Sequence, residues 1–260
     1  MLREKTLFED RDKVKESIQF LQDHEPPEGY YLAFSGGKDS ICIKELAKMA
    51  GVKHDSHYSV TTIDPPQLIY FIREHHPDVE FDRPERPLVK KMVEMGFPQR
   101  QRRWCCRLYK ERGGGGRRVV TGIRAAESAK RAGRRAIEAC YQDATKTYFN
   151  AIINWTDDDV WAFIKERELP YCELYDEGWK RIGCLFCPMA TKKERRMHRK
   201  RYPVIWRSFV KHFELLWEDR KRKADGDISS VDRWESGKEM AEWWLTEPDK
   251  TDPDQGVLFE

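Results

Sequence analysis

The segment from Tyr30 to Gly51 constrains the fold more than any other part of the chain. A short apolar run at residues 30–34 has the composition of a buried parallel strand. It leads into Ser-Gly-Gly-Lys-Asp-Ser at positions 35–40, and apolar residues at helical spacing follow until the glycine. A strand, a glycine turn and a helix start in this order predict a βα unit whose loop binds an anion.

The loop at residues 35–40 offers the groups that a phosphate needs. Its glycines let the backbone approach an anion, its serines add hydroxyl donors, and its lysine adds a point charge. The predicted phosphate-binding residues are Ser35, Gly36, Gly37, Lys38, Asp39 and Ser40. Among them Lys38 and Asp39 are the candidate catalytic residues, with Asp39 shaping the loop or a Mg²⁺ site.

The loop differs from the common nucleotide-binding motifs. A Walker A loop needs glycine where Leu32 stands, and serine or threonine where Asp39 stands. The spacing does not fit a G-x-G-x-x-G dinucleotide motif either. The alternative is an ordinary Gly-Gly turn between a strand and a helix.

Strand and helix patterns alternate along most of the chain. This alternation predicts an α/β fold with a doubly wound parallel sheet covered on both faces. The remaining expected strands are residues 52–62, 79–81, 119–123 and 150–153. The expected helices are residues 10–22, 67–74, 88–95 and 157–168, the last capped by Thr156.

Three parts of the chain are expected from these patterns. Residues 1–24 form an N-terminal helix, and residues 25–200 form the nucleotide-binding domain with the cysteines. Residues 201–260 form a Trp-rich helical C-terminal extension that ends in a polar tail from Glu247.

Charge and hydropathy argue against a membrane protein and leave a polyanionic partner open. Charged residues make up 36% of the chain, but the formal net charge of +3 does not by itself demand a nucleic-acid partner. The basic residues gather in runs that form either a positive face or a solvated surface: residues 100–107, 117–118, 131–135 and 192–201. No stretch approaches the ~20 apolar residues of a membrane span, and the start lacks an apolar secretory region. We therefore expect a cytoplasmic protein with no membrane contact.

Four of the seven cysteines stand in two close pairs, a spacing typical of metal ligands. Cys105 and Cys106 are adjacent, whereas Cys184 and Cys187 form a C-x-x-C hairpin. A [4Fe–4S] cube presents separated iron corners and suits adjacent cysteines better than one zinc ion does. Zinc, or thiols without a metal, are the alternatives, and Cys140 is an alternative to one member of the adjacent pair. A reducing cytosol argues against disulfides.

The hexapeptide at residues 35–40 resembles, residue for residue, the S-G-G-x-D-S signature of the PP-loop (N-type ATP pyrophosphatase) superfamily. The resemblance implies a Rossmann-like, adenine nucleotide α-hydrolase-like fold. It also implies ATP as the bound nucleotide, with Mg²⁺. In that family ATP is generally cleaved between its α and β phosphates, and the loop holds the pyrophosphate.

Three later segments resemble the phosphoadenosine phosphosulfate reductase-like family. Residues 122–128 resemble its G-I-R-x-x-[EQ]-S segment, which implies that Gly122 and Arg124 line the nucleotide pocket. Residues 154–161 resemble its W-T-x-x-D-V-W segment, although a capped helix with a core tryptophan explains them as well. Residues 169–184 resemble the lead into its cysteine hairpin. The cysteine order resembles that of adenosine 5′-phosphosulfate reductases and implies these [4Fe–4S] ligands: Cys105, Cys106, Cys184 and Cys187.

The chain departs from those reductases in two places. They carry a catalytic cysteine in a late E-C-G-x-H segment, whereas no cysteine follows Cys187 in this sequence. Their acidic-Thr-Gly segment after the second strand is replaced by Thr-Thr-Ile-Asp-Pro-Pro at residues 61–66. Without that nucleophile, thiosulfonate chemistry has no obvious route within the chain.

A nearer functional resemblance is to the iron–sulfur PP-loop enzymes that put sulfur into nucleic acid. It implies an ATP-dependent adenylating enzyme with DNA or RNA as acceptor, and a cysteine desulfurase or another sulfur donor as partner. One alternative is a sulfonucleotide reductase that uses a thiol supplied by another protein. A second is a nucleotide-binding module of a defence system that does not turn over. The sequence predicts no oligomeric state.

Overall fold

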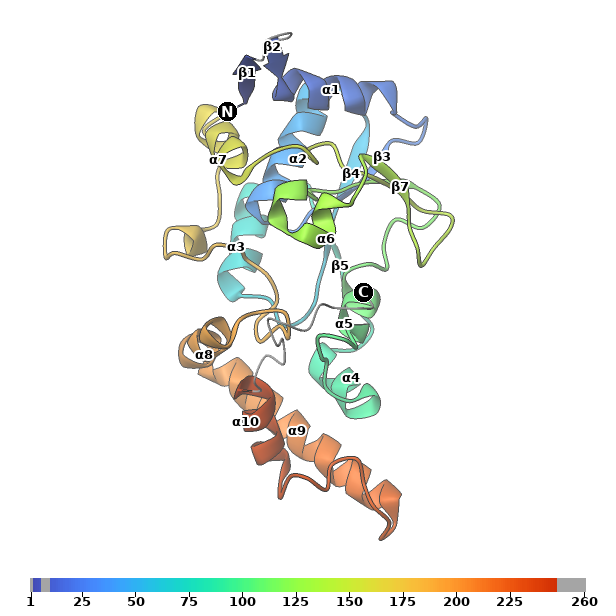
Figure 1. Cartoon of the computed structure of the whole chain (residues 1–260), viewed down its shortest axis with the longest axis vertical. Helices are drawn as coiled ribbons and strands as arrows, with labels where there is room; N and C mark the ends of the chain where they lie inside the picture. The colour runs from blue at the N-terminus through green and yellow to red at the C-terminus, as the bar shows by residue number, and fades with distance from the viewer. Residues whose placement is uncertain (1, 6–9, 247–260) are drawn as a thin grey trace. The chain divides into compact units, whose positions relative to one another are not determined.

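The structure is a computed structural model that describes residues 2–5 and 10–246 (Figure 1). The chain divides into two compact units, residues 1–85 with 105–184 and residues 86–104 with 185–260. Each unit combines two segments that are separated in the sequence. The sequence-based boundaries at residues 24 and 200 stay predictions, and the expected polar tail lies outside the described residues.

The first unit is built on a six-stranded sheet in the order β5-β4-β3-β6-β8-β7. The strands are β3 (Tyr30–Ala33), β4 (His54–Ser59), β5 (Glu80–Asp82), β6 (Arg118–Val120), β7 (Ile137–Ala139) and β8 (Thr147–Phe149). Neighbouring strands are parallel except β7, which runs antiparallel to β8. A separate hairpin pairs β1 (Arg3–Lys5) with β2 (Asp10–Asp12). The predicted Rossmann-like α/β class is therefore confirmed, with an antiparallel edge strand that the pattern did not predict.

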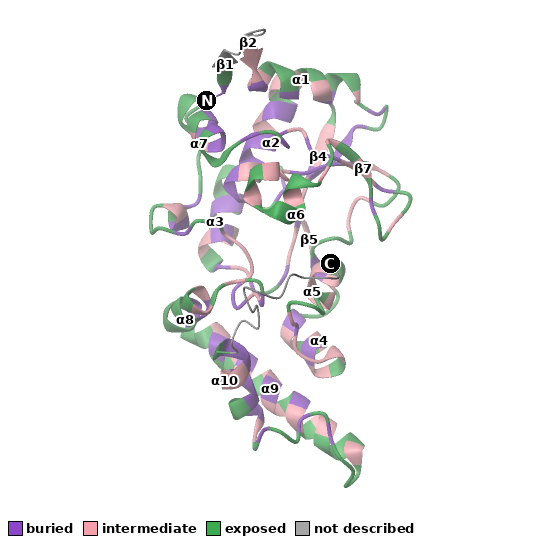
Figure 2. Cartoon of the chain, in the orientation of Figure 1, coloured by how far each residue is buried: buried purple, intermediate pink, exposed green. Residues whose placement is uncertain are grey.

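Helices connect the strands of this sheet and follow it along the chain to residue 166. They are α1 (Lys13–Asp23), α2 (Lys38–Ala50), α3 (Pro66–His75), α5 (Trp104–Tyr109), α6 (Ala129–Ala132) and α7 (Asp157–Glu166). The short 3₁₀ turns Ala125–Glu127 and Glu173–Tyr175 complete the connections. Helix α2 packs against both α1 and α7 and is largely buried (Figure 2). Gly51 ends α2 in the left-handed conformation, at φ 69°, as the sequence predicted.

The strand expected at residues 150–153 is wrong. The strand is β8, which ends at Phe149, and residues 151–154 form turns. Ile152 and Ile153 are buried, so their composition resembles that of a strand. The Asn150 side chain donates to the Arg135 carbonyl at 2.7 Å, and this contact holds the chain where it leaves the sheet.

The helix expected from residue 10 begins later, at Lys13, because Asp12 caps it. The Asp12 carboxylate accepts hydrogen bonds from the backbone N–H groups of Val14 and Lys15, both at 3.1 Å. At the other helix with a predicted cap, Thr156 accepts from the Asp159 N–H at 3.1 Å, and Asp159 accepts from the Thr156 N–H in return. These two reciprocal hydrogen bonds cap α7 at Thr156 and confirm its predicted start at Asp157.

The second unit is helical. Its helices are α4 (Leu88–Met95), α8 (Lys192–Arg201), α9 (Pro203–Ala224) and α10 (Gly237–Thr246). Helices α4 and α10 both pack against α9, around the buried rings of Phe209, Phe213 and Trp244. The expected helical C-terminal part is thereby confirmed. None of the described helices is long and apolar enough to cross a membrane.

Candidate nucleotide-phosphate site

The candidate site lies where the strand order of the sheet reverses. From β3 the chain builds β4 and β5 on one side, whereas β6 pairs with β3 on the other side. The loop at residues 35–37 follows β3, and Gly122 and Arg124 follow β6. In open parallel sheets, ligands bind at this kind of switch point, outside the carboxyl ends of the strands.

The glycines of the loop are required by its shape. Gly36 has φ +71°, and a Cβ atom there would lie 2.7 Å from side-chain carbons of both Leu68 and Ile72. Close packing of the loop on α3 therefore leaves no space for a side chain at this position. Ser40 fastens the turn, since its hydroxyl donates to the Gly37 carbonyl at 2.8 Å.

Gly122 brings the end of β6 close to the first turn of α2. A Cβ atom at Gly122 would lie 3.0 Å from both the carbonyl carbon and the Cβ atom of Asp39. Gly122 thus allows the segment that carries Arg124 to contact the phosphate loop directly.

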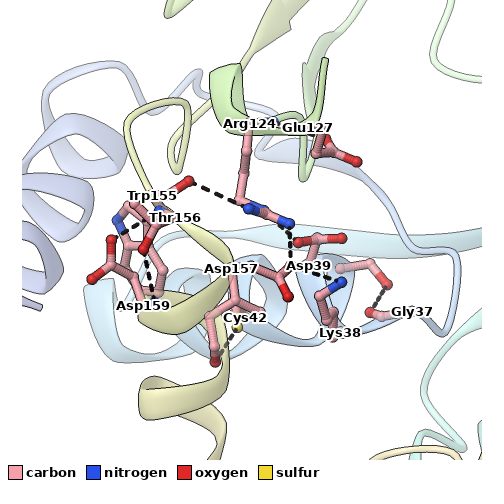
Figure 3. A network of polar contacts seen from close by, with 12 residues as sticks. Gly37, Lys38, Asp39, Cys42, Arg124, Glu127, Trp155, Thr156, Asp157 and Asp159 are labelled. Atoms are coloured by element: carbon pink, nitrogen blue, oxygen red, sulfur yellow. Dashed lines mark hydrogen bonds and ion pairs between the residues drawn. The ribbon is translucent and has the colours of Figure 1, made fainter. Parts of the chain in front are cut away.

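Lys38 and Arg124 meet on one oxygen atom, the Asp157 Oδ1 at the start of α7 (Figure 3). Lys38 Nζ lies 3.0 Å from this oxygen, and Arg124 Nη2 lies 2.9 Å from it. Arg124 Nε also donates to Asp39 Oδ1 at 2.6 Å. The Lys38 and Arg124 side chains are 7% and 3% exposed, whereas that of Asp157 is 61% exposed. Two buried cations therefore share an anionic oxygen on a carboxylate that water reaches.

The ionisation of these groups follows from burial and charge. Burial acts to raise the pKa of Asp157, but Lys38 and Arg124 together hold it below its ordinary value. Burial raises the pKa of Asp39 and outweighs the opposite effect of Arg124 and Lys38. Burial acts to lower the pKa of Arg124, but the charge of Asp39 and its hydrogen bond outweigh burial and raise this pKa above its ordinary value. Arg124 therefore remains charged.

Tyr175 closes the loop from a distant part of the chain. The backbone N–H of Lys38, at the first position of α2, donates to the Tyr175 hydroxyl oxygen at 2.9 Å. Lys38 Nζ also donates to the Lys180 carbonyl at 3.3 Å. The segment that leads to the cysteine hairpin therefore contacts the loop, which its sequence alone did not indicate.

The four candidate metal ligands are divided between the two units. Cys105, Cys106 and Cys184 belong to the first unit and Cys187 to the second, and all four are partly exposed. In the described part of the chain, no three His, Cys, Asp or Glu side chains are placed together as metal ligands would be. The assignment of the four cysteines as metal ligands therefore stays a prediction.

Cys140 has surroundings of its own at the end of β7. Its sulfur accepts a hydrogen bond from the Tyr148 hydroxyl at 3.4 Å. Burial acts to raise the pKa of the Cys140 thiol, but this bond and the backbone N–H groups of Gln142 and Asp143 lower it overall. Cys42 lies in the core on α2, as expected, and burial raises the pKa of its thiol.

A cavity of about 270 Å³ lies beside α3, away from the loop contacts. Its lining includes Pro66, Ile69, Tyr70 and Arg73, which share one face of α3. The loop residue Gly36 packs instead on Leu68 and Ile72. The cavity is therefore separate from the phosphate contacts described above.

Sequence reasoning placed the loop, Gly122 and Arg124 together but missed Asp157 and Tyr175. The sequence predicts Asp157 only as part of a capped helix, and it is indeed the first residue of α7. An acidic side chain in the first turn of a helix, within a segment that resembles a nucleotide-binding family, was the available signal. Nothing in the local sequence distinguishes Tyr175 from a core tyrosine.

The fold and site define a nucleotide-binding protein of the doubly wound α/β class. A family model places it more narrowly: the chain belongs to the phosphoadenosine phosphosulfate reductase domain family, which matches residues 29–190. This confirms the family resemblance seen in the sequence.

Individual relatives agree with this membership. The chain is 28% identical over 180 residues to the adenosine 5′-phosphosulfate reductase of Staphylococcus haemolyticus, covering 65% of this chain and 70% of that protein. It is 29% identical over 190 residues to an uncharacterized protein of Methanocaldococcus jannaschii, covering 67% of this chain and 39% of that protein. It covers 46% of a second protein from that organism, so the chain spans less than half of these two relatives. The activity of a whole relative is therefore not established for this chain.

A solved structure shares the fold. The crystal structure of phosphoadenylyl-sulfate (PAPS) reductase from Candida auris, a phosphate complex, matches with a TM-score of 0.50 at 21% identity. The match covers 66% of this chain and 87% of the other. At this identity the likeness supports the fold alone.

Proposed function

We propose that the chain is an ATP-dependent adenylating enzyme of the PP-loop type, acting in sulfur transfer to a nucleic acid. The observation that carries the proposal is the shared oxygen of Asp157, which Lys38 and Arg124 contact at 3.0 and 2.9 Å. A phosphate oxygen offers the same charge and the same hydrogen-bonding capacity as this carboxylate oxygen. Because the Asp157 side chain is largely exposed, a nucleotide phosphate can displace it from Lys38 and Arg124.

The loop and the two cations suit the leaving group of adenylation. An acceptor oxygen attacks the α phosphorus of ATP, the bond to the bridging oxygen of the β phosphate breaks, and pyrophosphate leaves with the negative charge. The start of α2 offers the positive end of a helix dipole, and a phosphate that displaces the Tyr175 hydroxyl would accept from the Lys38 N–H. Lys38 and Arg124 add two positive charges, whose attraction to the leaving group becomes stronger as negative charge develops on the pyrophosphate.

Asp39 and Asp157 are the proposed Mg²⁺ ligands. Both are carboxylates beside the phosphate site, and Mg²⁺ in such sites binds one or two carboxylates together with substrate phosphates. Their release from Arg124 and Lys38 by a nucleotide would free oxygen atoms for the ion.

The iron–sulfur cluster remains part of the proposal only as a ligand prediction. Thiolates are the donors that iron–sulfur clusters use, and the four cysteines Cys105, Cys106, Cys184 and Cys187 supply them. Because the described residues do not bring three such side chains together, no step of the proposed reaction is assigned to a cluster. A bound cluster would supply a route for sulfur delivery, and zinc is the alternative metal.

The proposal is tested by product analysis. The protein is incubated with ATP, Mg²⁺, DNA or RNA and a sulfide source, and pyrophosphate, AMP and sulfur in the nucleic acid are measured. We expect pyrophosphate release that requires the nucleic acid and that disappears in Lys38→Ala. ATP binding without pyrophosphate release from any acceptor would contradict the proposal.

A second candidate, a sulfonucleotide reductase, is favoured by the match to adenosine 5′-phosphosulfate reductases. Residues 188–260 contain no cysteine, so the attacking thiol would come from elsewhere. This candidate predicts sulfite release from a phosphosulfate with thioredoxin and without ATP. That result, in place of pyrophosphate release, would select the reductase.

A further inference from the structure

The second unit carries much more positive charge than the first. Its described residues, 86–104 and 185–246, contain 21 lysines and arginines against 11 aspartates and glutamates, a formal net charge of +10. Residues 1–85 and 105–184 contain 26 against 29, a formal net charge of −3. The small net charge of the whole chain therefore hides a strongly basic unit, which attracts polyanions.

Helix α8 concentrates this charge on its exposed face. Seven of its ten residues are lysine or arginine, and one is acidic. Arg195 and His198 are buried, at 4% exposure each. Lys193, Arg196 and Lys200 are exposed, and their spacing of three and four residues places them on one face of the helix.

The charges on this face are not neutralised within the described chain. Lys193, Arg196 and Lys200 have no acidic partner within 4.0 Å among the described residues. The basic end of α9 is different, because Lys221 pairs with Asp232, while Arg222 and Lys223 both pair with Asp219. The basic run of α9 is therefore neutralised by ion pairs within the chain, whereas these three exposed basic residues of α8 are not.

An uncompensated face of this kind costs α8 stability. Like charges three or four residues apart destabilise a helix by about 0.2–0.5 kcal/mol per pair. Lys192 and Lys193 stand in the first turn, where the helix dipole disfavours cations. Only the last-turn residues, among them Lys200 and Arg201, gain from the dipole. A bound polyanion would remove these costs.

The segment before the cysteine pair adds exposed arginines in the same unit. Arg102 and Arg103 are exposed and have no acidic partner among the described residues. Hydrogen bonds hold this segment in place: the Trp244 indole donates to the Pro98 carbonyl at 2.8 Å. Arg195 of α8 donates to the Trp244 carbonyl at 2.7 Å, so the same tryptophan connects the segment to α8.

We propose that five side chains of the second unit, named the α8 surface, bind the phosphate backbone of a nucleic acid: Arg102, Arg103, Lys193, Arg196 and Lys200. This inference rests on the proposed function, for which it identifies the part of the chain that binds the macromolecular acceptor. Backbone phosphates are the polyanion that separated lysines and arginines on a helix face fit best, because each contact releases a counterion and needs no fixed acidic pocket.

The test compares two triple variants that remove equal charge. Variant Lys193→Gln/Arg196→Gln/Lys200→Gln alters the α8 surface, and variant Lys221→Gln/Arg222→Gln/Lys223→Gln is the matched control on α9. Binding of labelled DNA duplex, single-stranded DNA and an RNA hairpin is measured over a series of salt concentrations. In the α8 variant, the slope of log K against log salt is expected to fall by about 2.7 for duplex and about 2 for single strands. The control is expected to keep the wild-type slope.

Three results would overturn the α8 surface. They are equal losses in both variants, no nucleic-acid binding by the wild type, and equally salt-dependent binding of polyglutamate or anionic vesicles that the α8 variant also loses. Circular dichroism and ATP titration of the variants check the fold and the nucleotide site. If the wild type releases pyrophosphate in the presence of nucleic acid but the α8 variant binds nucleic acid with the wild-type salt slope, only the surface fails. If it binds nucleic acid but no nucleotide, the proposed function fails and the surface stands.

Discussion

Both cations of the candidate site contact one oxygen of Asp157, the carboxylate at the start of α7. If a nucleotide phosphate takes over these contacts, the carboxylate competes with it. Asp157→Asn is therefore expected to raise the affinity for ATP without Mg²⁺ by about 3- to 10-fold, since a charge-assisted contact of this kind is worth about 1.5–3 kcal/mol and is only partly lost.

Titration calorimetry of ATP, with and without Mg²⁺, measures the effect of Asp157→Asn. The neighbouring Asp158 is exposed and provides the control, Asp158→Asn, which is expected to leave the affinity unchanged. With Mg²⁺ the gain is expected to shrink, because Asp157 is a proposed ligand of the ion. Weaker ATP binding without Mg²⁺ would show that Asp157 does not compete with the phosphate.

A substitution at Gly122 tests the close approach between the end of β6 and the first turn of α2. Gly122→Ala places a methyl group about 3.0 Å from the backbone of Asp39, so the first turn of α2 or the β6 end must shift. We expect a loss of about 1–3 kcal/mol in the free energy of unfolding and weaker nucleotide binding. Gly133→Ala is the control, since a Cβ atom there meets only the Lys130 carbonyl at 3.8 Å. Equal unfolding midpoints for the two variants would refute the close approach.

At the scale of elements, a buried ion pair joins α1 to α7. Lys13 Nζ lies 2.7 Å from Asp159 Oδ2, and both side chains are almost fully buried. Breaking such a pair by removing one partner leaves a buried charge, so Lys13→Met is expected to cost about 3–5 kcal/mol of unfolding free energy. Lys15→Met, on the exposed face of the same helix, is expected to cost little. Chemical denaturation measures both.

The same pair gives an acid dependence with a defined sign. Burial acts to raise the pKa of Asp159, but the contacts with Lys13 and Thr156 hold it well below its ordinary value. A carboxyl with a lowered folded-state pKa stabilises the fold above its unfolded pKa of about 3.9, and this stability is lost as the pH falls further. Lys13→Met should flatten the loss below about pH 4, and an unchanged acid profile would argue against the ion pair.

His76, which follows α3, provides a separate dependence at milder pH. Burial lowers the pKa of His76 to about 4, and Lys44 near its ring adds to the effect. Because the unfolded state binds the proton at a higher pH, stability falls as the pH decreases from about 6.5 to about 4, by roughly 3 kcal/mol at most. His76→Leu should remove this part of the dependence, whereas His75→Gln, at an exposed position, should retain it. Unfolding midpoints of the wild type and both variants between pH 4 and 7 measure this dependence. Equal pH dependence in His76→Leu and the wild type would contradict the prediction.

The elements that the sequence predicted well are those with local causes. Helix α4 has the predicted bounds, and α2 ends at the predicted glycine, because periodicity, caps and breakers act within a few residues. Helix α5 and strand β7 were missed, because each is short and depends on partners elsewhere in the chain. The turn after Asn150 was mistaken for a strand, because burial of Ile152 and Ile153 does not require a sheet.

At the scale of the whole molecule, motifs in the sequence predicted which segments of the first unit would meet at the candidate site. The loop, Gly122 and Arg124 were placed together through motifs, although β3 and β6 are far apart in the sequence. The contact of Asp157 with both cations could not be predicted, because it depends on where α7 begins relative to α2. The joining of residues 86–104 to the C-terminal helices depends on packing, and no local pattern encodes it.

The cysteines give a prediction for the intact chain. Anaerobically purified protein is expected to contain about four iron and four sulfide per chain and to absorb in the visible iron–sulfur band. Cys184→Ser and Cys187→Ser should each abolish this absorbance, whereas Cys42→Ser, in the core of the first unit, should not. Colourless protein with one zinc per chain would refute the cluster and support the alternative metal.

The central claim is that the loop after β3, with Lys38 and Arg124, binds nucleotide phosphates. Calorimetric titration of ATP into the wild type, Lys38→Ala and the control Lys221→Ala tests it most directly. Loss of one charge-assisted contact of about 1.5–3 kcal/mol predicts roughly 10- to 150-fold weaker binding in Lys38→Ala, with wild-type affinity in the control and an unchanged fold. An ATP affinity of folded Lys38→Ala equal to that of the wild type would contradict the claim.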